Sequence, residues 1–325
     1  MEQEFFEQRT DLTEINQGVE SIKSAIGSII IGQHDLIELL IAGILANGHI
    51  LIEGVPGVAK TLTAKLLAKC INAKFSRIQF TPDLMPSDVL GTAIFNPKST
   101  DFEFKQGPIF GNIILVDEIN RAPAKTQSAL FEVMEERQVT MDGITYLMEE
   151  PFIVLATQNP IEQEGTYRLP EAQLDRFLFK VEVGYPSLVE ETQLLTQHHR
   201  LSTDEKLGEI QPILNIQQIK RFRDTVKQLH VDDKLIEFVA KIVFQTRNNK
   251  SLFLGGSPRA SLAILNSAKA IAVMNNRDFV TPEDIIKVAL PVLRHRIMLT
   301  PDKEMEGATP DEIINQLIKN IEVPR

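Results

Sequence analysis

The chain has 325 residues, of which 43% are hydrophobic and 24% are charged. This length exceeds one typical domain and the composition allows a sizeable core, so we expect a folded α/β protein with two domains. Acidic residues outnumber basic residues by 44 to 34, and the net charge of −10 argues against a surface dominated by nucleic-acid binding, although a local basic channel is compatible with it.

Two helices are predicted before the first strand. Residues 11–28 carry apolar side chains at helical spacing, which places one face of an amphipathic helix along Leu12, Ile15, Val19, Ile22 and Ile26. The segment 30–33 then breaks this pattern, and a second helix is expected to end near Leu45.

A short apolar run at residues 50–52 leads into a loop that is typical of nucleoside triphosphate binding. The loop reads Gly54, Val55, Pro56, Gly57, Val58, Ala59, Lys60 and Thr61, and a helical pattern follows it. Glycines let backbone N–H groups surround phosphate oxygens, and the start of a helix favours negative charge. Lys60 is predicted to reach the β- and γ-phosphates of ATP, and the Thr61 hydroxyl to bind Mg²⁺. Ala59 replaces the last glycine of the usual pattern, and the turn allows it if its φ is negative.

A second element supports this interpretation over an ordinary strand-to-helix turn. Residues 113–116 are four consecutive apolar residues, which predicts a strand buried on both faces of a parallel sheet, and Asp117 and Glu118 follow directly. Ligands bind at the carboxyl ends of such strands. We therefore expect Asp117 to hold Mg²⁺ through water and Glu118 to polarise the water that attacks the γ-phosphate.

Strands are predicted at 49–53, 76–80, 113–117, 152–157 and 177–183, with helices between them, as a parallel α/β sheet requires. Two insertions interrupt the alternation, at about 91–109 and 137–149. The second contains Asp142-Gly143 between alternating residues, which predicts a type I′ hairpin.

A domain boundary is predicted after residue 186, which gives a nucleotide-binding domain at 1–186 and a helical domain at 187–325. Ser187 and Glu190 form a capping box that begins a helix. Thr281 and Thr309 are each followed by proline and then acidic residues, which predicts two more helix starts. The basic run 220–223 is interpreted as the solvated face of a helix.

Three further polar residues are candidates for the site. Asn159 ends the fourth predicted strand and could contact the attacking water or the γ-phosphate. Arg176 precedes the fifth strand, where an ion pair with Asp175 or Glu171 is an equal alternative. Arg259 lies in the first turn of a predicted helix, where the helix dipole disfavours a cation, so an anionic neighbour such as a nucleotide phosphate is expected.

Nothing in the sequence predicts secretion or membrane insertion. The first residues lack the basic and apolar parts of a signal peptide, and the apolar stretch 36–51 is interrupted by Glu38, Asn47 and His49. The single cysteine, Cys70, is interpreted as a small core residue. We expect a cytoplasmic protein without a membrane span.

From about residue 20 to 300 the chain resembles the MoxR family of AAA+ ATPases. The run 159–167, continued by 169–177, is close to a signature of that family, although Arg168 stands where the family usually has proline. Further similarity lies in the phosphate loop with its alanine (Walker A), in 117–122 (Walker B), in 80–83 and in 257–260.

The resemblance implies an AAA+ P-loop fold: a five-stranded parallel sheet of order 5-1-4-3-2 with β-hairpin insertions, followed by an all-α lid. ATP and Mg²⁺ would lie between neighbours of a homo-oligomeric, usually hexameric, ring. By that resemblance Asn159 is sensor 1, Arg176 is the arginine finger that acts on a neighbour's nucleotide, and Arg259 is sensor 2, in cis or in trans. Ile31 and Gln33 fall where AAA+ proteins contact adenine.

The same resemblance implies an ATPase with a chaperone-like role in remodelling or maturing protein clients, including metal insertion, together with a separate von Willebrand factor A-domain partner. The two insertions correspond to hairpins that usually face the pore and contact clients. One alternative is a nucleic-acid motor or loader, which would need basic hairpins, whereas here acids balance the lysines. Another alternative is a nucleotide-switched scaffold with little hydrolysis, which would not need the complete set of hydrolytic residues.

Overall fold

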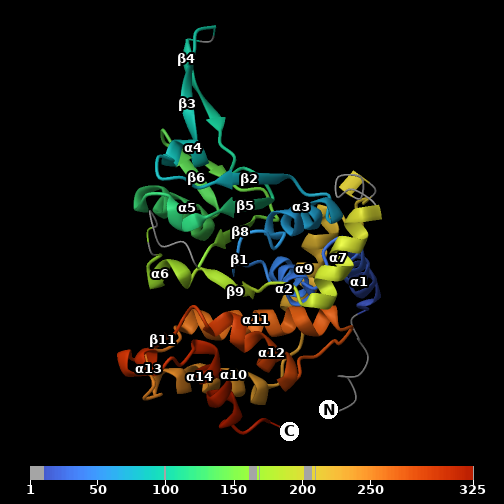
Figure 1. Ribbon diagram of the computed structural model, residues 1–325. Coiled ribbons are helices and arrows are strands. Elements are labelled where there is room, and N and C mark those ends of the chain that lie inside the picture. The colour runs from blue at the N-terminus through green and yellow to red at the C-terminus, as the bar shows by residue number, and fades with distance from the viewer. Residues whose placement is uncertain are drawn as a thin grey trace, which may run out of the picture.

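The computed structural model describes residues 11–98, 100–160, 167, 169–200, 207–208 and 210–324. At its centre is a five-stranded sheet of β1 (His49–Gly54), β2 (Phe75–Gln79), β5 (Ile113–Asp117), β8 (Ile153–Gln158) and β9 (Phe177–Val183) (Figure 1). The strands are all parallel and lie in the order β2-β5-β8-β1-β9. If these five strands are counted along the chain and read from β9, the order is 5-1-4-3-2.

Strand β5 separates two hydrophobic cores because its side chains alternate between the faces of the sheet. Ile113 and Leu115 belong to one core, and Ile114 and Val116 to the other. The first core includes residues of α1 (Thr13–Gly27), α2 (His34–Leu45) and α3 (Lys60–Cys70). The second includes residues of α4 (Pro86–Leu90) and α5 (Ala124–Glu136). The sheet is therefore covered on both faces, and Cys70 is a buried core residue as predicted.

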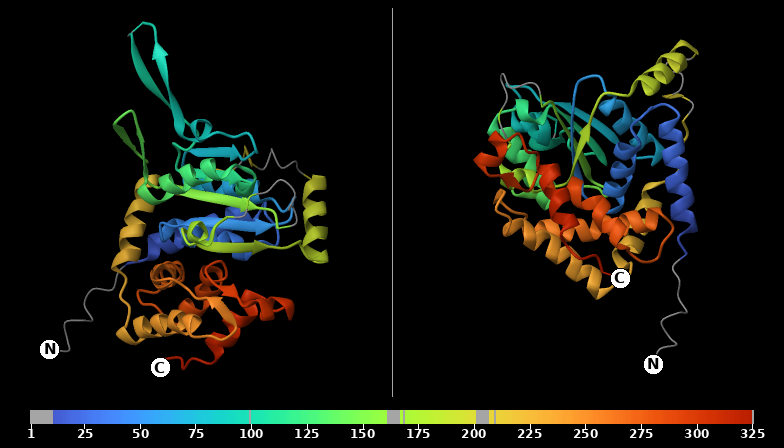
Figure 2. Two further views of the ribbon diagram at one scale, coloured as in Figure 1. Left: turned by 90° about the vertical axis from the view of Figure 1, so that its left-hand side faces the viewer. Right: turned by 60° about the horizontal axis from the view of Figure 1, so that its bottom comes forward.

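Both predicted insertions are antiparallel hairpins. One pairs β3 (Gly91–Asn96) with β4 (Asp101–Gln106), and it projects from the body of the molecule (Figures 1 and 2). The other pairs β6 (Gln138–Met141) with β7 (Ile144–Leu147). Asp142 and Gly143 have φ of 51° and 80°, so the predicted type I′ turn is confirmed.

The second half of the chain is mainly helical. Its helices are α6 (Glu171–Leu174), α7 (Leu188–Arg200), α9 (Ile216–Gln228), α10 (Asp233–Arg247), α11 (Pro258–Met274), α12 (Pro282–Leu293), α13 (Pro301–Met305) and α14 (Pro310–Lys319). The prediction of an all-α lid was wrong in one respect, because β10 (Leu252–Leu254) pairs with β11 (Met298–Leu299). The capping boxes at Ser187, Thr281 and Thr309 are present.

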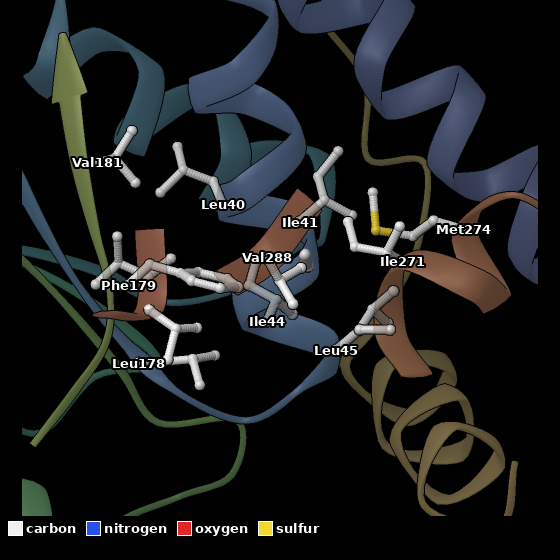
Figure 3. Packing of buried hydrophobic residues seen from close by; sticks show 14 of the residues in the cluster. Leu40, Ile41, Ile44, Leu45, Leu178, Phe179, Val181, Ile271, Met274 and Val288 are labelled. Atoms are coloured by element: carbon white, nitrogen blue, oxygen red, sulfur yellow. The ribbon is translucent and has the colours of Figure 1, made fainter. Parts of the chain in front are cut away.

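The lid packs directly against the sheet domain. Figure 3 shows Leu40 and Ile44 of α2 and Phe179 of β9 in the same cluster as Ile271 of α11 and Val288 of α12. One continuous core therefore joins the two halves of the chain.

The interpretation of residues 220–223 as a solvated face was wrong for Arg223. This side chain is buried because α9 packs against both α2 and α11, and its Nε donates to the Ile44 carbonyl at 2.7 Å. Among the described helices, none combines the length and apolar character that crossing a membrane requires.

Candidate functional site

The loop between β1 and α3 has the backbone of a phosphate-binding loop. Gly57 has φ of 86°, which glycine adopts without strain. The expectation of a negative φ at Ala59 was wrong, because its φ is 57° and its ψ is 22°, in the left-handed region. Ala59 immediately precedes α3 and adopts this conformation although its Cβ makes positive φ less favourable than it is for glycine.

Lys60 begins α3 and turns back over its own loop. Its Nζ donates to the Gly54 carbonyl. Burial lowers the pKa of the lysine, while the charges of Asp117, Glu118 and Glu53 oppose that shift. The ammonium group thus contacts a carbonyl of its own loop and lies in the field of three nearby carboxylates, and Thr61 is the next residue of the same helical turn.

A cavity of about 530 Å³ adjoins this loop, a volume within the range of small-molecule sites. Its lining includes Gly57, Val58 and Ala59 together with Ile31 and Gln33, so the structure brings the two predicted adenine-contacting residues to the phosphate loop. The last two residues of β9, the segment 184–186 that follows it and two residues of α7 also line the cavity.

Gln33 presents an acceptor without a partner at this cavity. Its Nε2 donates to the Val58 carbonyl at 2.5 Å, which fixes the orientation of the amide. Its Oε1 is buried, and no described residue donates to it. A buried acceptor is normally satisfied, so a ligand with an N–H donor, such as the amino group of adenine, fits here.

Asp117 and Glu118 lie at the carboxyl end of β5, as predicted. The Asp117 carboxylate accepts from Thr157 Oγ1 at 3.2 Å and from Arg77 Nε at 2.6 Å. Glu118 has φ of 58°, and its Oε2 accepts from Arg121 Nε at 2.9 Å. The two acids are thus held by different partners.

Sequence reasoning missed several of these partners. Gln79 Nε2 donates to Glu118 Oε2 at 3.2 Å, and the Glu118 amide donates to Thr157 Oγ1 at 3.0 Å. Gln79 could have been found only from the strand order, because β2 lies next to β5 and their register pairs Gln79 with Asp117. Arg121 follows Glu118 on a short 3-10 helix, Ile119–Arg121.

Asn159 directly follows β8, which lies between β5 and β1 in the sheet. Its side chain is buried. The parallel order therefore brings Asn159 to the same edge as the phosphate loop and the two acids.

Arg176 and Arg259 do not belong to this group. Both bind Glu135 in the last turn of α5: Arg176 Nη1 lies 3.2 Å from Oε2, and Arg259 Nη2 lies 2.7 Å from Oε1. The ion pair considered for Arg176 with Asp175 or Glu171 is therefore replaced by one with Glu135. The anion expected beside Arg259 is likewise this carboxylate of its own chain.

The two arginines lie at the amino ends of the strands, whereas the phosphate loop lies at the carboxyl ends. Arg176 precedes β9, whose seven residues run parallel to β1 and span roughly 20 Å. The far end of β9 lines the nucleotide-sized cavity, whereas neither arginine does. Within one chain, Arg176 and Arg259 thus lie far from the residues that would hold phosphates.

Comparisons with known proteins agree with this geometry. A family model described as "ATPase family associated with various cellular activities (AAA)" matches residues 49–179, and one described as "AAA lid domain" matches residues 244–317. The chain is 47% identical over 299 residues to the uncharacterized protein YeaC of Bacillus subtilis, covering 92% of each chain. It is 44% identical over 306 residues to the chaperone MoxR1 of Mycobacterium tuberculosis, covering 91% of this chain and 80% of that protein. The chain belongs to the MoxR family of AAA+ ATPases.

A solved crystal structure has the same fold. A protein of Cytophaga hutchinsonii, described as a candidate ATPase, superimposes on 95% of this MoxR-family chain with a TM-score of 0.88 and 41% identity, and 96% of that protein is covered. Part of the family signature, residues 161–166 and 168, lies outside the described residues.

Proposed function

We propose that this MoxR-family chain binds and hydrolyses ATP at a site shared between neighbouring copies. The observation that carries the proposal is the separation of the two halves of the site. The phosphate loop and the acids lie at the carboxyl ends of the parallel strands, whereas Arg176 and Arg259 lie at the amino ends. Because neither arginine can reach the nucleotide of its own chain, both would act in trans, as arginine fingers do.

Each residue of the nucleotide half has a proposed role. Lys60 and the loop amides bind the phosphates, and Ile31 and Gln33 contact adenine. No described cluster of three or more His, Cys, Asp or Glu side chains could hold a metal by itself. Mg²⁺ would instead enter with ATP and bind the Thr61 hydroxyl and Asp117, through water, where it neutralises phosphate charge.

Glu118 is the proposed general base. It accepts the proton of the water that attacks the γ-phosphorus, as the bond from phosphorus to the β-γ bridging oxygen breaks and ADP leaves. The contacts of Glu118 with Gln79 and Arg121 orient its carboxylate, and Arg121 must yield to the water for proton transfer. Asn159 would hydrogen-bond this water or the γ-phosphate.

We further propose a cytoplasmic, chaperone-like role on protein clients in a homo-oligomeric, hexameric ring. The projecting hairpins expose apolar side chains, including Phe102 at 67% and Leu147 at 71% exposure. Exposed apolar side chains on hairpins suit protein segments better than the anionic backbone of nucleic acid, which requires basic residues. A von Willebrand factor A-domain partner and metal insertion are finer proposals that rest on the family alone.

The domain boundary after residue 186 is also proposed. The chain leaves the sheet at Val183 and begins α7 at the Ser187 capping box. Residues 187–325 would then form the lid that carries Arg259.

The test is ATP hydrolysis per subunit over a range of protein concentrations, with the assembly size measured in parallel. A shared site predicts that specific activity rises as subunits associate, and that Glu118→Gln binds ATP without turnover. Constant specific activity from a persistent monomer would contradict the proposal.

A further inference from the structure

We infer that Glu135 and Asp175 are positioning residues that hold Arg176 and Arg259 side by side, so that one subunit presents two arginines to its neighbour's nucleotide as a pre-arranged pair. This inference rests on the proposed function, because it requires both arginines to act in trans. Glu135 lies outside every motif of the sequence, and Asp175 lies within the family signature but was considered there only as an ion-pair partner of Arg176.

Glu135 joins the two guanidinium groups. Arg176 Nη1 binds one oxygen of its carboxylate and Arg259 Nη2 binds the other, at 3.2 and 2.7 Å. Arg176 Nη1 also donates to the Phe131 carbonyl at 2.9 Å, one turn earlier on α5. Two guanidinium groups repel each other at short range, so a carboxylate between them is what allows both to occupy one place.

Asp175 joins the backbone segments from which the two arginines extend. It directly precedes Arg176, and its Oδ2 accepts from Ser257 Oγ at 2.9 Å. Ser257 is the N-cap of α11 and stands two residues before Arg259. A single carboxylate thus links the end of the sheet domain to the start of the helix that carries the second arginine.

Arg296 of the lid holds this junction in place. Its Nε donates to Asp175 Oδ1 at 2.7 Å, and its other nitrogens donate to the carbonyls of Asp175 and Phe177, at 3.1 and 2.5 Å. The Arg296 side chain is only 4% exposed. The backbone on both sides of Arg176 is therefore anchored by one buried guanidinium, which limits how far the arginine can move.

This arrangement predicts which kinetic constant a change at Glu135 would alter. Glu135→Gln keeps an acceptor but removes the charge, so the two guanidinium groups are expected to separate. The nucleotide cavity of the same subunit lies at the carboxyl ends of the strands, and neither Glu135 nor Asp175 lines it. The turnover number should therefore fall while the KM for ATP stays unchanged.

The experiment uses mixed assemblies of two full-length variants. The donor, Glu118→Gln, has both arginines but no base. The acceptor, Arg176→Ala with Arg259→Ala, has the base but no arginines. Mixing them restores turnover only where an acceptor's nucleotide faces a donor's arginines. A mixture without turnover would overturn the shared site, and this inference with it.

Glu135→Gln is then added to one partner at a time. In the donor it is expected to lower mixed turnover on the order of tenfold, and in the acceptor, which has no arginines to position, it should cause no loss. Ser257→Ala in the donor, which removes one bond to Asp175, should cause a smaller loss. Glu135→Asp should recover part of the activity, and Glu132→Gln, an exposed acid on the same helix, is the matched control.

The outcomes distinguish a failure of the positioning role from a failure of the shared site. If the mixture is active and a Glu135→Gln donor supports equal or higher turnover, the positioning role is wrong while the shared site stands. Equal losses in donor and acceptor would show a general structural defect and would also overturn the inference.

Discussion

At the scale of single residues, His49 shows how burial fixes a protonation state. Its Nδ1 accepts from the Val154 amide at 2.9 Å, and its Nε2 donates to the Met134 carbonyl at 3.1 Å. Burial lowers the pKa of this imidazole to about 3, and the charge of Arg137 acts in the same direction. The fold therefore requires the neutral ring.

We predict that His49 contributes to acid sensitivity. An unfolded histidine has a pKa near 6.5, so between roughly pH 6.5 and 3 the unfolded chain binds one more proton at this position than the folded chain. The free energy of unfolding should fall as pH falls through this window, by at most about 1.4 kcal/mol per pH unit from this group. His49→Gln keeps a donor and an acceptor, and should flatten the pH dependence in urea unfolding between pH 7 and 4.

Burial lowers the pKa of His295 as well, so some pH dependence should survive the substitution. Identical slopes for the wild type and His49→Gln would show that the imidazole is not the group that titrates.

Some site residues were predictable one at a time and others were not. Lys60 and Asp117 stand in local sequence motifs whose residue types and spacing are those that phosphate and Mg²⁺ binding require. Glu135 stands in an ordinary helical pattern, and only the tertiary fold brings the end of α5 to Arg176 before β9 and Arg259 at the start of α11. Arg223 was assigned to solvent because its neighbours are charged, whereas the position of α9 between two helices decides its burial.

At the scale of elements, one residue of the phosphate loop has an unfavourable backbone conformation. Ala59 adopts a left-handed backbone that costs an alanine roughly 1 kcal/mol and costs glycine almost nothing. Ala59→Gly should therefore raise the free energy of unfolding by up to about 1 kcal/mol and retain ATP affinity. Ala59→Val, β-branched at the same φ, should lower both. Thermal unfolding with and without ATP measures both effects, and a destabilised glycine variant would contradict this account.

The β3–β4 hairpin carries two aromatic side chains that face solvent instead of a core. Phe95 and Phe102 contact each other with ring centroids 5.4 Å apart, yet they are 49% and 67% exposed. Replacing both by serine should change the free energy of unfolding by less than about 1 kcal/mol and should leave basal hydrolysis intact. Stimulation of the ATPase by a permanently unfolded model protein should fall, and unchanged stimulation would exclude this hairpin as the client contact.

Hairpins were easier to predict than the lid strands. Asp142-Gly143 requires a specific turn, and that requirement is local. Strands β10 and β11 have only three and two residues, which is too short for an alternating pattern to appear in the sequence.

At the scale of the whole molecule, the two halves share one core. The cluster that contains α2 and β9 also contains α11 and α12, which the sequence could not indicate because the apolar face of a helix does not identify its partner. We therefore expect one cooperative unfolding transition, with fluorescence and circular dichroism coinciding.

Arg296 is the polar counterpart of that shared core. Arg296→Met would remove the buried cation that pairs with the Asp175 carboxylate, together with one donor each to the Phe177 and Leu178 carbonyls. Ser257 would still donate to Asp175 and His295 to Phe177, but the carboxylate would lose its charged partner, so we expect a loss of roughly 3–5 kcal/mol in the free energy of unfolding. Calorimetry should show a lower or divided transition. A variant as stable as the wild type would mean that these contacts are replaced by water.

The separation of the phosphate loop from the arginines by roughly the 20 Å length of β9 has a consequence for counting active sites. A subunit with unlike faces joins its neighbour head to tail, and such contacts are heterologous. An open row of n copies then contains n − 1 complete sites, because the last nucleotide lacks an arginine pair and the first pair lacks a nucleotide. Only closure into a ring completes the final site. The turnover per subunit would therefore show whether the ring has closed.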